Sequence, residues 1–148
     1  MEIKIQSATI KNLKDIQELN HQLYIKENKE FDSTINKNFS IQKSGENYFK
    51  KRIKNDCTLI ATVDGKTIGY LVGAISEVSD YRSILKLAEA ENMFVLEEYR
   101  SLGVGKKLMN EFVKWCKSNK IKRMRVVASA QNIQAIKFRN KTTNTKRM

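Results

Sequence analysis

Residues 99–109 read YRSLGVGKKLM, and they place Gly103 and Gly105 at the start of an amphipathic helix. Glycine inside a helix costs roughly 1 kcal/mol relative to alanine, so two glycines at this position need a reason. The first backbone N–H groups of a helix have no intrahelical partner, and the helix dipole makes that end partly positive. Glycine lets an anion approach these groups and lets the chain bend so that they converge. The stretch therefore predicts a cradle for a phosphorylated ligand.

The length and composition indicate one folded domain over residues 1–148. The chain has 148 residues, of which 41% are hydrophobic, and this is enough for one sizeable core. Its two cysteines, Cys57 and Cys116, have neither metal-ligand nor disulfide spacing. Because we find no signal-peptide pattern and no apolar run of about 20 residues, we expect a cytoplasmic protein without a membrane partner and without a metal.

The net charge of +12 indicates attraction to polyanions. Nucleic acid, an acidic membrane and a phosphorylated ligand all fit this sign of charge. A lysine-rich surface that is merely solvated gives the same total, so charge alone does not choose among them.

The pattern along the chain predicts a mixed α/β domain without internal repeats. Residues 58–76 predict a hairpin, because Asp64-Gly65 suits a type I′ turn between two β-rich runs. Further strands are expected over residues 3–8, 84–95 and 124–128. One helix should follow Asn12 as its cap, with Asp15 in the capping-box position, and a second should follow Ser44. The remaining helices are expected at residues 103–119 and 132–138, and a long irregular segment at residues 26–43.

Two common nucleotide-binding patterns do not fit the glycine stretch. GxGxxG requires a glycine where Leu108 stands, and the P-loop requires Ser or Thr where Lys107 stands. What remains is R-x-x-G-x-G from Arg100 to Gly105, between an apolar strand and a long helix. With the Asp-Gly hairpin upstream and Asn132-x-x-Ala135-x-x-Phe138 downstream, this arrangement resembles the GNAT superfamily of N-acetyltransferases over residues 1–138.

The resemblance implies a GNAT-like acyl-CoA N-acyltransferase fold: a mixed, mostly antiparallel central sheet flanked by helices. The family usually continues past Phe138 with a tyrosine and two more strands, but here an atypical basic tail, residues 139–148, ends the chain. We therefore expect a sheet that lacks its usual last strands. The strand at residues 124–128 would then keep an open edge, through which two copies could form a homodimer.

The resemblance also implies that acetyl-CoA is the co-substrate. In the family, the strand before the glycine turn hydrogen-bonds the pantetheine arm, and the turn holds the pyrophosphate. Carried onto this sequence, the expected cofactor-binding residues are Met93, Phe94, Val95, Arg100, Ser101, Leu102, Gly103, Val104, Gly105, Lys106, Asn132 and Phe138.

Acetyl transfer to a primary amine requires the amine to lose a proton before or during attack, and a carboxylate can take that proton. Glu91 directly precedes the strand residues that match the family, at a position where some members place a base. Glu89 matches the position used by others and lies two residues earlier, on the same face of a regular strand. We prefer Glu91 as the general base, keep Glu89 as the alternative, and note that both could instead only bind a cationic amine.

The sequence is also compatible with two other functions. The altered C-terminus also fits a degenerate relative that binds acetyl-CoA with little turnover. A basic nucleic-acid-binding module is the less favoured alternative, supported by Lys120, Lys122, Arg123 and Arg125 but lacking a recognisable reading element.

Overall fold

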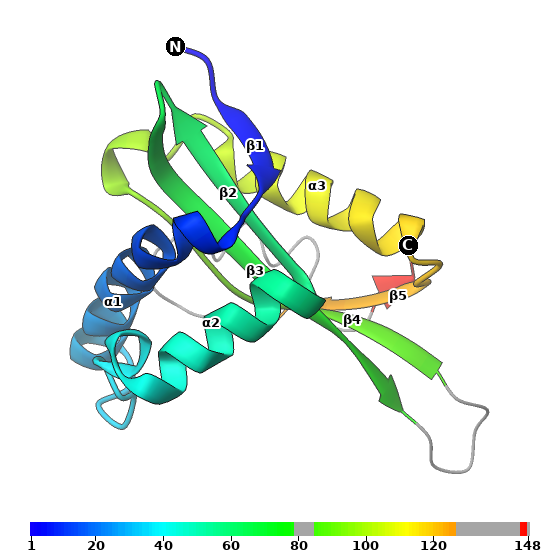
Figure 1. Cartoon of the computed structure of the whole chain (residues 1–148), viewed down its shortest axis with the longest axis horizontal. Coiled ribbons are helices and arrows are strands. Elements are labelled where there is room, and N and C mark those ends of the chain that lie inside the picture. Colours follow the sequence, from blue (N-terminus) through cyan, green and yellow to red (C-terminus); the bar gives the residue numbers. More distant parts are fainter. Residues whose placement is uncertain (79–84, 127–145, 148) are drawn as a thin grey trace.

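Figure 1 shows the computed structural model of the chain, which describes residues 1–78, 85–126 and 146–147. Six strands of these residues form one sheet in the order β1-β2-β3-β4-β5-β6. They are β1 (Lys4–Ser7), β2 (Cys57–Val63), β3 (Lys66–Val78), β4 (Leu85–Val95), β5 (Arg123–Val126) and β6 (Lys146–Arg147). Only the β4–β5 pair is parallel, so the predicted mixed, mostly antiparallel sheet is confirmed.

In the described residues, three α-helices cover the two faces of this sheet. They are α1 (Leu13–Glu30), α2 (Lys43–Asn55) and α3 (Val104–Ser118), with short 3-10 turns η1 (Ile10–Asn12), η2 (Phe39–Ile41) and η3 (Glu97–Tyr99). Helices α1 and α2 lie on one face and α3 lies on the other (Figure 1). The apolar stripe of α3 buries Leu108 and Phe112, whereas Leu23 and Phe49 fill the core beneath α1 and α2. The sheet therefore separates two cores, each formed by the apolar side of its helices.

The β2–β3 hairpin turns at the predicted dipeptide. Asp64 has φ 49° and Gly65 has φ 79°, and Val63 pairs with Lys66 across the turn. Two consecutive positive φ angles are what a type I′ turn requires. The hairpin prediction is therefore confirmed.

The starts of the first two helices differ from the predicted caps. The Asn12 side chain accepts a hydrogen bond from the Thr9 N–H at 2.8 Å, within the capping box of η1, and makes no cap bond to α1. The Asp15 carboxylate accepts a bond from the Thr67 hydroxyl at 3.0 Å. Helix α2 begins one residue before Ser44, and α1 continues to Glu30, so the irregular segment is shorter than expected. Helix α1 does follow Asn12 as its N-cap residue, but the predicted capping box does not form, because the Asn12 side chain bonds within η1 and Asp15 bonds Thr67. The predicted cap of α2 was wrong, since Gln42 and not Ser44 is its N-cap.

The C-terminal end also differs from expectation. Arg147 and Lys146 pair antiparallel with Arg123 and Met124 of β5. The prediction that this strand keeps an open edge is therefore wrong for those two β5 residues. The predicted helix at residues 132–138, with Asn132 and Phe138, lies outside the described residues.

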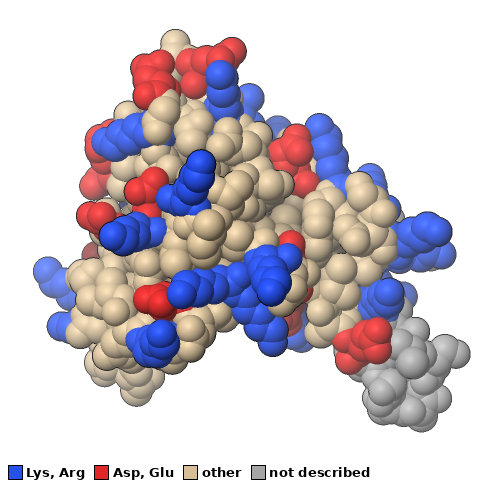
Figure 2. Space-filling model, in the orientation of Figure 1, with Lys and Arg blue, Asp and Glu red and all other residues tan. Residues whose placement is uncertain are grey.

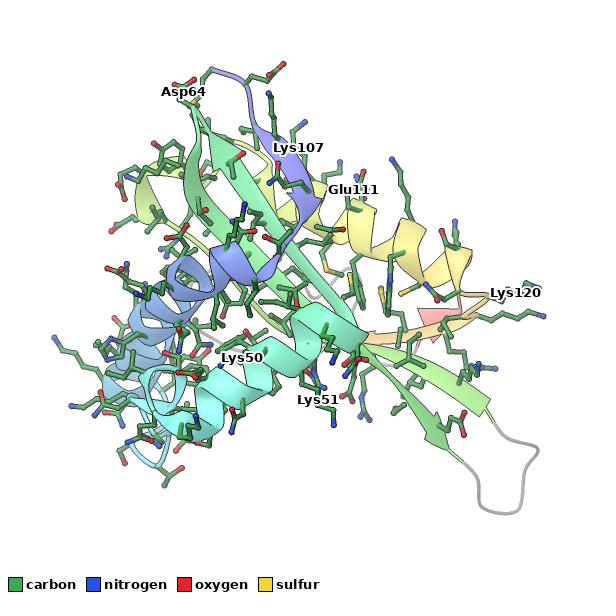
Figure 3. All side chains as sticks on the ribbon, in the orientation of Figure 1. Lys50, Lys51, Asp64, Lys107, Glu111 and Lys120 are labelled. Carbon is green, nitrogen blue, oxygen red and sulfur yellow. The ribbon has the colours of Figure 1, made fainter. Side chains whose placement is uncertain are left out.

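Charged side chains are spread over the face that Figure 2 presents, with acidic groups among the lysines and arginines. Figure 3 places Lys50 and Lys51 on α2, and Lys107 and Glu111 on α3. In the described part of the chain, no helix has both the length and the apolar character needed to cross a membrane. On this face the positive charge is mixed with acidic groups and forms no single uninterrupted patch.

Candidate active site

A β-bulge in β4 places two consecutive side chains on the same side of the sheet. Val72 of β3 pairs with Asn92, but the next residue, Gly73, pairs with Ala90, so Glu91 is the extra residue. Ala88 and Ala90 belong to the core beneath α3. Beyond the bulge, Met93 belongs to that same core. Glu91 and Asn92 therefore both face α2, where a regular strand would send them to opposite faces.

The Glu91 carboxylate is held by two residues of α2. The Tyr48 hydroxyl donates to Glu91 Oε1 at 2.6 Å, and the Arg52 Nε–H donates to the same oxygen at 2.7 Å. Arg52 Nη2 donates to Oε2 at 3.1 Å, which completes a two-pronged contact. The side chains of Glu91 and Arg52 are 22% and 18% exposed, so the pair is largely shielded from water.

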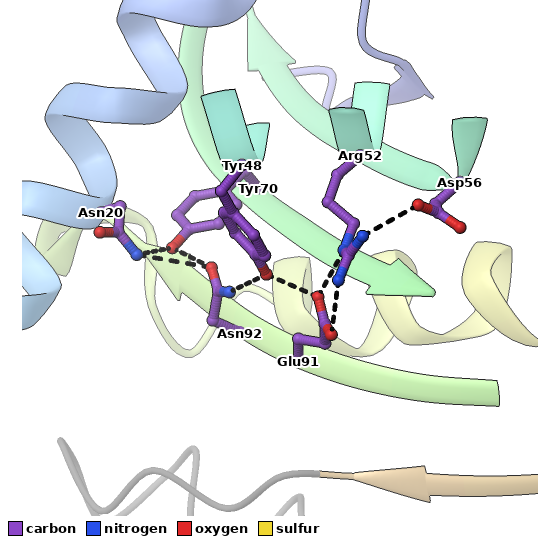
Figure 4. Close-up of polar contacts among 7 residues, drawn as sticks. All are labelled: Asn20, Tyr48, Arg52, Asp56, Tyr70, Glu91 and Asn92. Atoms are coloured by element: carbon purple, nitrogen blue, oxygen red, sulfur yellow. Dashed lines mark hydrogen bonds and ion pairs between the residues drawn. The ribbon is translucent and has the colours of Figure 1, made fainter. Parts of the chain in front are cut away.

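A chain of hydrogen bonds continues from Tyr48 into the core (Figure 4). Asn92 Nδ2 donates to the Tyr48 hydroxyl at 3.1 Å, and the Tyr70 hydroxyl donates to Asn92 Oδ1 at 2.6 Å. Asn20 Nδ2 of α1 donates to the Tyr70 hydroxyl at 2.9 Å. The bulge therefore connects Glu91 to both helices on this face.

The electrostatics of this cluster keep its members in definite protonation states. Burial, together with the Glu91 carboxylate, raises the pKa of the Tyr48 phenol well above its usual range. The hydrogen bond to Glu91 raises the pKa of the Arg52 guanidinium further. Tyr48 is therefore a phenol that donates a hydrogen bond, and Arg52 is a permanent cation beside Glu91. Asp56 accepts a second bond from Arg52, at 3.1 Å from Nη1.

Glu89, the alternative carboxylate, lies in a different environment. It pairs with Arg125 in the parallel β4–β5 register, and the two side chains form an ion pair. Arg125 is 50% exposed. An exposed cation exchanges its partner for water at little cost, so this pair constrains Glu89 less than Arg52 constrains Glu91.

The glycine turn leads from η3 into α3. Gly103 has φ 79° and is the N-cap of α3, and Ser101 also has a positive φ of 70°. A Cβ on Gly103 would meet nothing within 4 Å, so glycine is needed there for the backbone conformation. A Cβ on Gly105 would meet the Met93 Cε at 3.6 Å, an ordinary contact. The two glycines therefore play different structural parts.

Arg100 folds back onto the strand that precedes it. Its Nε donates to the Val95 carbonyl oxygen at 2.8 Å, and its guanidinium lies 5.1 Å from the centre of the Phe94 ring. The Arg100 N–H donates to the Glu97 carbonyl oxygen at 3.2 Å. Arg100 thus holds the end of β4 and the glycine turn together.

The structure brings most expected residues to one strand and the turn after it. Met93, Phe94 and Val95 end β4, and residues 100–106 follow after Leu96 and the short η3 turn. Sequence reasoning missed Tyr48 and Arg52 as partners of Glu91. It also missed the residues that continue the hydrogen bonds from Tyr48 into the core, which are Asn92, Tyr70 and Asn20. The i,i+4 spacing of Tyr48 and Arg52, and a buried asparagine inside the apolar stripe of α1, were the available signals.

A mostly antiparallel sheet with a bulged carboxylate strand and a glycine turn before a long helix is typical of one class of acyl-transferring folds. The sequence profile of the Acetyltransferase (GNAT) family matches residues 15–141. The chain therefore belongs to that family. A relative from Archaeoglobus fulgidus, described as an uncharacterized N-acetyltransferase, is 27% identical over 95 residues. This match covers 63% of the present chain and 64% of the relative.

Solved structures show the same fold. PaiA N-acetyltransferase from Thermoplasma acidophilum, in complex with coenzyme A, has a TM-score of 0.76 and 22% identity. The match covers 96% of the present chain and 89% of that one. An aminoglycoside N-acetyltransferase in complex with CoA has a TM-score of 0.73 and 20% identity, covering 99% and 91% of the two chains.

Proposed function

We propose that the protein transfers an acetyl group from acetyl-CoA to a primary amine of a small molecule or peptide. The observation that carries this proposal is the course of β4. This strand leads from the partly buried Glu91, through the short η3 turn, to the glycine turn and α3. A carboxylate for the amine and a cradle for phosphates are thus built on one continuous segment.

The turn and α3 supply the groups that a pyrophosphate requires. The Lys107 N–H donates to the Gly103 carbonyl oxygen at 3.0 Å, which is the first helical bond. The N–H groups of Val104, Gly105 and Lys106 precede it and have no acceptor within the helix. Because the space beside Gly103 is open, a phosphate can approach these N–H groups. Lys106 adds a positive charge at the same place.

The proposed reaction is direct attack. The amine nitrogen forms a bond to the thioester carbonyl carbon, the carbon–sulfur bond breaks, and the thiolate leaves and takes a proton. Glu91 receives the proton that the amine loses, with Glu89 as the alternative base. Holding the two reactants side by side supplies a further part of the rate. The buried, free Cys57 and Cys116 thiols favour a reducing compartment, so we place the protein in the cytoplasm.

Thermal unfolding tests the first half of this proposal. Acetyl-CoA should raise the melting temperature progressively with concentration, as mass action requires, and a single-stranded oligonucleotide should not. Stabilisation by the oligonucleotide alone would instead favour the nucleic-acid-binding alternative.

Thiol release tests the second half. Acetyl-CoA is mixed with neamine, spermidine or a lysine-containing peptide, and free CoA is measured with and without protein. Acetyl-CoA binding without thiol release for any amine would favour the degenerate, non-catalytic relative.

A further inference from the structure

We propose that Tyr48 and Arg52 of α2 are positioning residues that fix the Glu91 carboxylate and leave its Oε2 to take the amine proton. This inference rests on the proposed function. It adds the residues that orient the general base and thereby control the rate of proton transfer. Neither residue is expected to touch acetyl-CoA or the acceptor.

The direction of the hydrogen bonds fixes the Tyr48 proton. Asn92 Oδ1 accepts from the Tyr70 hydroxyl at 2.6 Å, so the other side-chain atom of Asn92 is its donor nitrogen. That nitrogen donates to the Tyr48 oxygen at 3.1 Å. The Tyr48 proton therefore points away from Asn92 and toward Glu91 Oε1, 2.6 Å away.

The chain of hydrogen bonds begins at Asn20, in the core. Asn20 is fully buried and donates to the Tyr70 hydroxyl at 2.9 Å, so Tyr70 in turn must donate to Asn92. Each hydroxyl thus accepts one bond and donates one, and all donors point toward Glu91. Hydrogen bonds aligned in one direction polarise and strengthen one another. The carboxylate at the end of the chain is consequently held in one orientation.

Arg52 is itself held on three sides. It contacts both oxygens of Glu91, donates to Asp56 Oδ2 at 3.1 Å, and lies 4.9 Å from the centre of the Tyr48 ring. A planar guanidinium between two carboxylates and an aromatic face has little freedom to rotate. Arg52 therefore holds the Glu91 carboxylate at a fixed place relative to α2.

The distribution of donors distinguishes the two carboxylate oxygens. Among the described residues, Oε1 accepts from both Tyr48 and Arg52, whereas Oε2 accepts from Arg52 alone. Oε2 therefore retains more capacity to accept a proton. The α2 contacts thus select both the orientation of Glu91 and the oxygen that reacts.

The packing of α2 does not depend on the Tyr48 hydroxyl. Phe49 is fully buried in the core beneath the helix, and the Tyr48 ring itself lies 4.9 Å from Phe49 and 5.8 Å from Phe39. Tyr48→Phe keeps these ring contacts and removes only the hydroxyl. The variant should fold and should test the positioning role directly.

The experiment measures kcat and KM by CoA release, with acetyl-CoA and whichever of neamine, spermidine or the lysine peptide the unmodified protein acetylates. Because a hydrogen bond to a charged group is lost, Tyr48→Phe should lower kcat about tenfold and leave KM for acetyl-CoA unchanged. Arg52→Gln should lower kcat at least as much, and Arg52→Lys should recover part of the loss. Lys50→Gln removes an exposed charge of the same helix, which bonds Glu46 and not Glu91, and it should keep full activity.

A double variant separates positioning from a general structural effect. If Tyr48 acts through Glu91, then Tyr48→Phe with Glu91→Gln should be no slower than Glu91→Gln alone. Additive losses, or wild-type kcat in both Tyr48→Phe and Arg52→Gln, would overturn the positioning role while leaving acetyl transfer in place. An unmodified protein that releases no CoA with any of the three amines would overturn the proposed function itself.

Discussion

Gly103 and Gly65 share the same left-handed φ angle, 79°, and a Cβ on either would meet nothing within 4 Å. One lies at the start of α3 and the other in the β2–β3 turn, beside Asp64. Any cost of substituting them is therefore conformational in both cases. Substituting each glycine in turn therefore separates the loss of ligand binding at Gly103 from the loss of stability caused by backbone strain.

Gly103→Ala should lose about 1–2 kcal/mol of stability, because an L-residue in the left-handed region is strained. Gly65→Ala should lose a similar amount. Only the Gly103 variant should also weaken acetyl-CoA binding, by about tenfold or more, since a side chain there narrows the approach to the N–H groups. Urea unfolding and isothermal titration measure the two effects. Equal acetyl-CoA affinity in both variants would contradict the phosphate cradle.

Glu91→Gln should reduce kcat by about 10²–10⁴-fold, the usual contribution of a general base, and leave acetyl-CoA affinity nearly intact. Glu89→Gln is the matched variant on the same strand and should have the smaller effect. Steady-state CoA release and acetyl-CoA titration give the two quantities. A large loss of kcat in Glu89→Gln alone would identify Glu89, and not Glu91, as the general base.

Neither cysteine should react with a thiol reagent in the folded protein. Burial raises the pKa of the Cys57 and Cys116 thiols to about 12, so almost no thiolate exists at pH 8. Ellman's reagent should therefore label no thiol in the native state and two after unfolding in urea. Rapid labelling of the native protein would contradict the burial of these side chains.

The same thiols should make stability depend on alkaline pH. An unfolded cysteine ionises near pH 8.5, whereas the folded thiols stay protonated. The unfolded state therefore binds fewer protons between about pH 8.5 and 12, and the stability due to these groups should fall as the pH rises through that range. Urea midpoints at pH 7.5 and 9.5 compare the two conditions.

Gly45→Ala should destabilise the fold strongly. A Cβ at Gly45 of α2 would lie 2.0 Å from the Phe39 carbonyl oxygen, which is backbone and cannot move aside alone. We expect a loss of about 1–3 kcal/mol, typical of overpacking. Gly105→Ala is the control for stability, because its Cβ would make an ordinary contact at 3.6 Å with the Met93 side chain. Urea unfolding of both variants should show a lower midpoint for Gly45→Ala only.

Much of the fold follows from local pattern. Alternation and the Asp64-Gly65 turn predict the hairpin, and the stripe that includes Leu108 and Phe112 predicts α3, because these signals lie within single elements. The helix starts were harder, since the Asn12 side chain bonds back to the Thr9 N–H in the capping box of η1 and not forward to α1. The tail was misjudged because pairing of Lys146 with Met124 depends on residues distant in sequence.

In the candidate site, too, the residues of one segment could be predicted from the sequence, whereas contacts between distant segments could not. The glycine turn and Glu91 are recognisable because motif and spacing lie in one segment. The contacts of Tyr48 and Arg52 with Glu91 join residues 39 and more positions apart, so only the docking of α2 reveals them. The bulge was also hidden, because it is a property of how β4 matches β3 and not of β4 alone.

The extra residue at Glu91 makes β4 two half-strands that are out of phase with each other. Ala88, Ala90 and Met93 all face α3. The usual alternation of side chains along a strand, followed from either end of β4, therefore predicts the wrong face for the residues beyond the bulge. Deleting one residue here would remove the bulge and turn either the alanines or Met93 toward α1 and α2. Any transplant of this strand into another scaffold must therefore carry the Val72–Gly73 segment of β3 with it.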